Sequence, residues 1–69
     1  MTQEDYMWLS QRERYLYVST RMTTEETQTM YDIYNRLTGE NKKSNGCGAC
    51  LRNTVNTVRH HYELYKKNL

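Results

Sequence analysis

The stretch that decides the fold is LRNTVNTVRHHYELYKKNL, which runs from Leu51 to Leu69. Its apolar residues recur at alternating intervals of four and three, the spacing of a helix that packs along one seam. These residues are Leu51, Val55, Val58, Tyr62, Tyr65 and Leu69. We therefore predict a helix over residues 50–69, and so short a seam favours packing within a small bundle over an independent coiled coil.

A second helix is predicted over residues 25–38. Thr23 and Glu26 have the spacing of a capping box, in which each side chain caps the backbone N–H of the other. Gly39 follows as a C-terminal stop. The apolar residues between these signals share one helical face, and they are Met30, Ile33, Tyr34 and Leu37.

The N-terminal segment is predicted to form a helix over residues 3–20. Thr2 and Asp5 resemble another capped start. One helical stripe accounts for Trp8, Tyr15, Val18 and Met22. The run YLYV at 15–18 has the composition of a strand, so a short strand is the alternative. The predicted fold class is all-α, a small bundle of two to three helices forming a single domain over residues 1–69.

The composition leaves little material for an independent core. The chain has 69 residues, of which 36% are hydrophobic, ten are Leu, Ile or Val, and none is Phe. Much of the apolar volume lies in seven Tyr, one Trp and four Met, side chains that are common at interfaces. We therefore expect the bundle to be completed by homo-oligomerisation or against a partner protein.

The charge is divided unevenly along the chain. Residues 1–40 carry four Lys or Arg against seven Asp or Glu, a net charge of −3, and residues 41–69 carry six against one, a net charge of +5. The basic half suits an anionic partner, a head-to-tail contact between subunits or simply a solvated helix. The sequence shows neither a membrane-length apolar run nor the features of a signal peptide, so we expect a cytoplasmic protein without a membrane partner.

The stretch NGCGACLRNTVNTVRHH, residues 45–61, invites interpretation as a zinc site. However, His60 lies ten residues after Cys50, which is about 15 Å along a helix. Cys47, Cys50, His60 and His61 therefore cannot converge on one ion if that segment is helical. We expect no cofactor, and a zinc ion shared by Cys47 and Cys50 of two subunits is the alternative left open.

Two metal-free interpretations of the cysteines are also open. A CxxC motif at a helix start can support redox chemistry, although the βαβ pattern of a thioredoxin-like protein is missing here. In the other interpretation Cys50 is a small buried apolar residue and Cys47 lies in a turn. For an intracellular protein we expect these thiols to be reduced rather than joined in a structural disulfide.

The overlapping stretch KKSNGCGACLRNT, residues 42–54, has features of an anion site, because a glycine-bearing basic loop leads into a helix N-terminus. The alternative is a glycine turn that only starts the helix. Backbone N–H groups there can receive a phosphate, and glycines allow close approach. The candidate ligand-binding residues are Lys42, Lys43, Gly46, Gly48, Arg52, Asn53, Thr54 and Arg59. Trp8 and Tyr62 are candidates for stacking on a nucleotide base.

The segment YNRLTGENKKSNGCGACLR, Tyr34 to Arg52, resembles a pattern in short uncharacterised proteins of tailed bacteriophages. In that pattern a helix ending in YNxxxG leads through a basic loop to CxxCxR at the start of the next helix. The resemblance covers under a third of the chain. It implies a phage origin and a helix–loop–helix core, and it carries no catalytic role.

An enzyme is not expected, because no acid–base pair or activated nucleophile stands at a recognisable spacing. The leading hypothesis is a homo-oligomeric, anti-defence phage protein that sequesters a nucleotide signal or nucleic acid at the basic glycine loop. The rival hypothesis is a protein-interaction or virion component that docks through its Tyr-rich helices.

Overall fold

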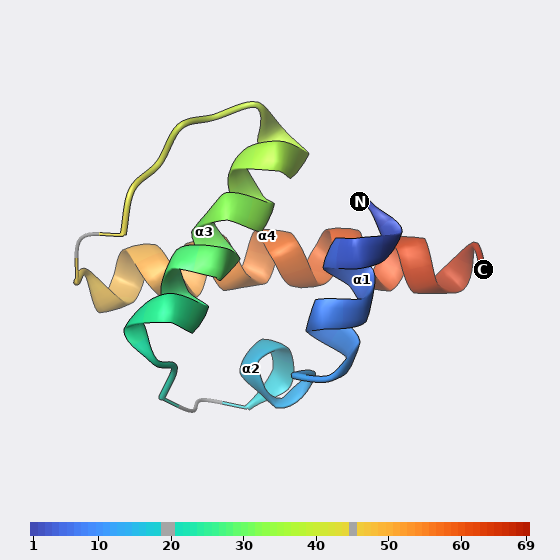
Figure 1. Ribbon diagram of the computed structural model, residues 1–69, viewed down its shortest axis with the longest axis horizontal. Helices are drawn as coiled ribbons and strands as arrows, with labels where there is room; N and C mark the ends of the chain where they lie inside the picture. Colours follow the sequence, from blue (N-terminus) through green and yellow to red (C-terminus); the bar gives the residue numbers. More distant parts are fainter. Residues whose placement is uncertain (19–20, 45) are drawn as a thin grey trace.

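The computed structural model describes residues 1–18, 21–44 and 46–69, and these form four helices and no strand. Helix α4 (Gly48–Lys67) runs along the longest axis of the molecule, and α3 (Thr24–Thr38) crosses it (Figure 1). Helix α1 (Gln3–Ser10) and the single turn α2 (Arg14–Tyr17) also pack against α4. The prediction of a small all-α bundle is confirmed.

Helix α4 begins two residues earlier than predicted. Cys47 is its N-cap, and the sulfur of Cys47 accepts a hydrogen bond of 3.1 Å from the backbone N–H of Cys50. The predicted seam is buried at Val55, Val58 and Tyr62. On either side of these residues, Leu51 and Tyr65 are partly buried. The last seam residue, Leu69, lies beyond the end of the helix and is 77% exposed.

Helix α3 agrees with the sequence prediction at both ends. The Thr23 hydroxyl accepts from the N–H of Glu26, and the N–H of Thr23 donates to the Glu26 carboxylate, so the capping box is present. Gly39 ends the helix with φ at 75°, a left-handed conformation that favours glycine. Tyr31 joins the predicted apolar face as an additional buried residue.

The N-terminal segment is not one helix, and the prediction of a continuous helix over residues 3–20 is wrong. The backbone N–H groups of Arg12, Tyr15 and Leu16 each bond the carbonyl three residues back, at 2.9 Å, so the chain turns tightly between α1 and α2. The turn buries Leu9 and Leu16 in place of the predicted stripe, and Val18 is left 60% exposed. The strand alternative at 15–18 is also wrong, because α2 is helical there. Residues 19 and 20 of the predicted helix lie outside the described residues.

Helix α1 is held in place by one ion pair and one aromatic cluster. The Arg36 guanidinium on α3 bonds both oxygens of the buried Asp5 carboxylate, at 2.7 and 3.0 Å. Tyr6 lies between two tyrosines of α4, with ring centroids 5.2 Å from Tyr62 and 4.9 Å from Tyr65. These contacts fix the N-terminal helix over the C-terminal half of α4.

The core is formed within a single chain. It contains Leu9, Leu16, Met30, Ile33, Tyr34, Val55, Val58 and Tyr62. Every helix contributes to it, and the partly buried Met and Tyr side chains pack around it. The structure holds one chain, so the expected homo-oligomer stays a prediction.

Replacing Thr54 with valine is expected to stabilise the protein. Thr54 is fully buried on α4, and its hydroxyl has no hydrogen-bond partner among the described residues. An unpaired buried hydroxyl costs free energy, so Thr54→Val should raise the free energy of unfolding by about 1 kcal/mol. Chemical denaturation measures this, with Thr54→Ser as the control that keeps the hydroxyl and loses the methyl group. A Thr54→Val protein less stable than the wild type would show that the hydroxyl is paired.

Candidate functional site

A groove of about 400 Å³ lies between α2 and the N-terminal half of α4. Its lining residues are Tyr15, Leu16, Tyr17, Val18, Met22, Gly48, Leu51, Arg52, Val55, Asn56 and Arg59. The bend after α1 creates this groove, because it turns α2 so that the segment from Tyr15 to Val18 faces α4. One wall is apolar, and the α4 side carries two arginines.

The two arginines of the groove differ in their contacts. Arg59 is half-buried, and its guanidinium donates a hydrogen bond of 3.0 Å to the carbonyl of Leu16 at the end of α2. Arg52 is exposed, and none of the ion pairs or hydrogen bonds among the described residues involves its guanidinium. Arg52 is thus available to an incoming anion, whereas Arg59 is already oriented.

Tyr17 closes one side of the groove. Its hydroxyl donates to Glu63 at 3.2 Å. Burial, followed by this bond to a carboxylate, raises the pKa of the Tyr17 phenol above its ordinary value. At neutral pH the Tyr17 phenol is protonated and donates this hydrogen bond to the Glu63 carboxylate.

A second hollow of about 240 Å³ adjoins the groove and shares Met22, Gly48 and Leu51 with it. Its remaining lining residues are Thr24, Thr27, Tyr31, Ser44, Gly46 and Cys47. Two of the glycines predicted from the loop, Gly46 and Gly48, therefore lie beside accessible space.

Cys47 and Cys50 are bonded to each other as a disulfide, with Cα atoms 5.2 Å apart. The expectation of reduced thiols is therefore wrong for this structure. Cys47 is the N-cap of α4 and Cys50 lies three residues later in its first turn, which brings the two sulfurs together. His60 and His61 contact each other further along α4, with ring centroids 5.9 Å apart. In the described part of the chain no three His, Cys, Asp or Glu side chains gather where they could hold a metal ion.

The basic loop is only partly directed toward the groove. The backbone of Lys42 is held by the Asn35 side chain, which donates to its carbonyl at 2.8 Å and accepts from its N–H at 2.9 Å. The Lys42 ammonium lies 4.9 Å from the centre of the Tyr34 ring. Lys42 is thus fixed at the C-terminal end of α3, and the exposed Lys43 follows it in the loop.

Two predicted contact residues are corrected by the fold. Thr54 and Tyr62 are fully or almost fully buried in the core, so their side chains have no surface to offer a ligand. Asn53 is exposed on α4 but does not line the groove. The groove residue that sequence reasoning missed is Asn56, which lies four residues after Arg52 and three before Arg59 on the same face of the helix.

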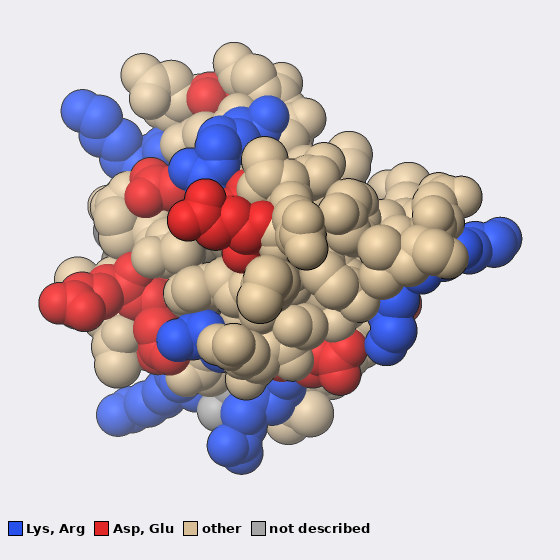
Figure 2. Space-filling model, turned by 45° about the vertical axis from the view of Figure 1, so that its right-hand side comes forward, with Lys and Arg blue, Asp and Glu red and all other residues tan. Residues whose placement is uncertain are grey.

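The basic excess of the C-terminal half does not form one broad patch on the face drawn in Figure 2. Lys and Arg side chains project at separate places around this face, and Asp and Glu lie between them. Among the basic residues of the C-terminal half, Lys66 lies 3.4 Å from the Glu13 carboxylate. On this face, therefore, the basic side chains are separated by acidic ones.

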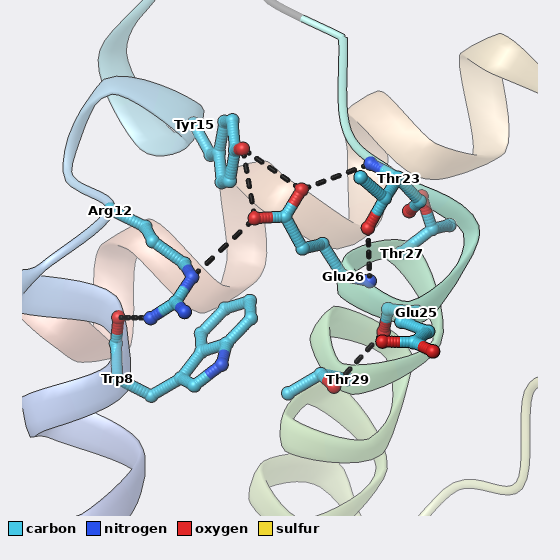
Figure 3. A network of polar contacts seen from close by, with 8 residues as sticks. All are labelled: Trp8, Arg12, Tyr15, Thr23, Glu25, Glu26, Thr27 and Thr29. Atoms are coloured by element: carbon cyan, nitrogen blue, oxygen red, sulfur yellow. Dashed lines mark hydrogen bonds and ion pairs between the residues drawn. The ribbon is translucent and has the colours of Figure 1, made fainter.

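A polar network centred on Glu26 joins the three N-terminal helices (Figure 3). The Tyr15 hydroxyl lies 2.9 Å from both Glu26 carboxylate oxygens, and Arg12 contacts the same carboxylate at 3.5 Å. The Arg12 guanidinium also lies 4.5 Å from the centre of the Trp8 ring. Trp8 therefore has a structural contact with Arg12, and its predicted role in stacking on a nucleotide base stays a prediction.

The network predicts a loss of stability at both extremes of pH. Hydrogen bonds from the Thr23 backbone N–H and the Tyr15 hydroxyl lower the pKa of the Glu26 carboxyl group. The ionised carboxylate therefore adds to the free energy of unfolding above pH 4.5, and this contribution is lost as pH falls through the lowered pKa. Hydrogen bonding to Glu26, together with burial, raises the pKa of Tyr15, so its contribution is present below pH 10 and lost as pH rises through the raised value. The melting temperature should therefore fall at acidic pH and again at strongly basic pH. In Tyr15→Phe both decreases in melting temperature with pH should be smaller. A Tyr15→Phe protein with unchanged slopes would contradict this.

Comparison with protein-family models, with curated proteins and with solved structures finds no match to this chain. The similarity to tailed-phage proteins therefore stays a prediction. No helix in the described ranges is both long and apolar enough to cross a bilayer.

Proposed function

We propose that this protein binds a phosphate-bearing ligand in the groove between α2 and α4, without catalysing a reaction on it. The observation that carries the proposal is Arg52, an exposed cation with no described ionic partner, on the wall of a groove that also holds Arg59. A guanidinium presents several donors in a plane, which suits phosphate oxygens.

The groove has the mixed character of a nucleotide site. Arg52, Asn56 and Arg59 supply donors from the α4 side, and the opposite side is mostly apolar. The volume of about 400 Å³ falls within the usual range for small-molecule sites. A phosphate near Arg52 with a base or other apolar body against the accessible side chains of Val18 and Leu51 would satisfy both sides.

The groove favours binding over catalysis. Among the described residues that line it, none carries a carboxylate, an imidazole or a thiol, the usual general acids, bases and nucleophiles. Sequestration of a nucleotide signal or of a nucleic-acid end in the cytoplasm of an infected cell is consistent with this chemistry and with the phage resemblance.

Isothermal titration calorimetry tests the proposal. The panel contains inorganic phosphate, mononucleotides, cyclic dinucleotides and short DNA, each at two salt concentrations. We expect heat from at least one nucleotide, and the affinity should fall at the higher salt because ionic contacts are screened. No heat with any member of the panel would overturn the proposal.

A second candidate function is protein docking, including contact between copies of this chain, and it rests on exposed apolar side chains. Large apolar residues are about half exposed or more at Met7, Tyr17, Val18, Leu64 and Leu69. Such residues are common at interfaces. Light scattering distinguishes this candidate from the first: a concentration-independent monomer mass would exclude a homo-oligomer.

A further inference from the structure

We propose that Cys47 and Cys50 form a redox-active pair that exchanges its disulfide with a low-molecular-weight, peptide-like thiol of the glutathione class. The two bonded cysteines are half-exposed at the start of α4, and Cys47 lines the hollow of about 240 Å³. This inference is independent of ligand binding in the larger groove.

The surroundings favour negative charge on the sulfur of Cys47. The N–H of Cys50 donates to this sulfur at 3.1 Å, and the first turn of α4 contains no acidic residue. A thiolate formed at Cys47 would keep this N–H donor and would lie at the positive end of a helix of 20 residues. Because the thiolate is the attacking form in disulfide exchange, Cys47 is the sulfur expected to react first.

The hollow beside Cys47 gives a thiol partner somewhere to lie. Hydroxyl groups of Thr24, Thr27 and Ser44 line it together with apolar side chains. Hydroxyl groups both donate and accept hydrogen bonds, so they can pair with the amide and carboxylate groups of a peptide-like thiol. The Cys47–Cys50 disulfide thus lies beside a hollow that can hold the thiol partner.

The exchange is a balanced two-electron reaction. In the reduced protein, the Cys47 thiolate attacks one sulfur of oxidised glutathione, forms a mixed disulfide at Cys47 and releases one glutathione thiolate. Cys50 loses its proton to solvent and attacks the Cys47 sulfur. The second glutathione thiolate leaves, and the Cys47–Cys50 disulfide is formed. The protein dithiol is oxidised and glutathione disulfide is reduced; excess glutathione reverses both steps.

Acid-quenched reaction of the reduced full-length chain with oxidised glutathione, followed by peptide mapping, tests the order of attack. We expect the mixed disulfide on Cys47. In matched single-cysteine variants, Cys50→Ser should form its glutathione adduct about tenfold faster than Cys47→Ser. The reduced peptide NGCGACLR provides an unfolded reference that should react more slowly than the folded protein. Mapping on the wild-type chain keeps the test valid if either variant fails to fold.

The hollow is tested separately with Thr27→Phe, which fills part of it. This variant should slow the reaction with oxidised glutathione several-fold and leave the reaction with the disulfide of 2-mercaptoethanol unchanged. Equal slowing of both reagents, or of neither, would overturn the role of the hollow. An adduct on Cys50, equal rates for the two single-cysteine variants, or a folded protein no faster than the peptide would overturn the redox assignment.

Discussion

Replacement of Tyr62 with alanine is expected to remove a large share of the stability of the fold. Tyr62 lies on α4 and is almost fully buried. Its ring stacks on Tyr6 of α1, and its hydroxyl donates a hydrogen bond to Glu13. Removing a buried aromatic side chain costs about 3 to 5 kcal/mol. A chain of 69 residues has a total stability of about 3 to 10 kcal/mol, so this loss is a large share of it and the melting curve followed by circular dichroism should shift strongly to lower temperature.

Two controls separate packing from polarity at this position. Tyr62→Phe keeps the ring and removes only the hydroxyl, so it should remain folded with a lower melting temperature. Tyr65→Ala removes a half-buried ring from the same cluster and should cost less than Tyr62→Ala. A folded Tyr62→Ala protein with near-normal stability would show that the tyrosine cluster is not part of the core.

Arg52→Ala is expected to weaken ligand binding without destabilising the free protein. Loss of hydrogen bonds to a charged group costs about 1.5 to 3 kcal/mol, which corresponds to a fall in affinity of roughly tenfold to a hundredfold. Arg52 is the fifth residue of α4 and has no ion pair with the described residues, so its removal should leave the melting temperature almost unchanged. Calorimetry with the tightest-binding nucleotide and a thermal melt measure both quantities.

Lys67→Ala is the matched control, since it removes the same charge from the far end of α4. Equal losses of affinity in the two variants would indicate a general electrostatic effect. A different outcome would contradict the binding role of Arg52. In that outcome, Arg52→Ala binds the nucleotide as the wild type does, but it has a lower melting temperature or a different oligomeric state. Arg52 would then pair with an acidic residue of another subunit.

The two strongest helices could be predicted because their signals are local. Thr23, Glu26 and Gly39 mark the ends of α3, and the apolar spacing identifies the buried face of α4. The break between α1 and α2 carries no Gly or Pro, since residues 11–13 read QRE. Contacts from α4 accompany the break there: Tyr62 bonds Glu13, and Arg59 bonds the Leu16 carbonyl. Such distant contacts are not visible in the local sequence.

The candidate site was predictable only in part. Gly48, Arg52 and Arg59 follow from the loop motif and the basic helix, and all three line the groove. Thr54 was misassigned although it lies four residues before the buried Val58, a spacing that places both side chains on one face. The opposite wall of the groove depends on the bend after α1, so sequence periodicity gave no sign of it.

Because α4 is the helix against which the others pack, its place at the end of the helix order affects how the chain folds during synthesis. Helices α1, α2 and α3 each pack against α4, which is the last of the four to be translated. Helices of this length are marginal in water when they lack a packing surface. We therefore expect the first three helices to gain most of their stability only after residue 48, once α4 emerges from the ribosome.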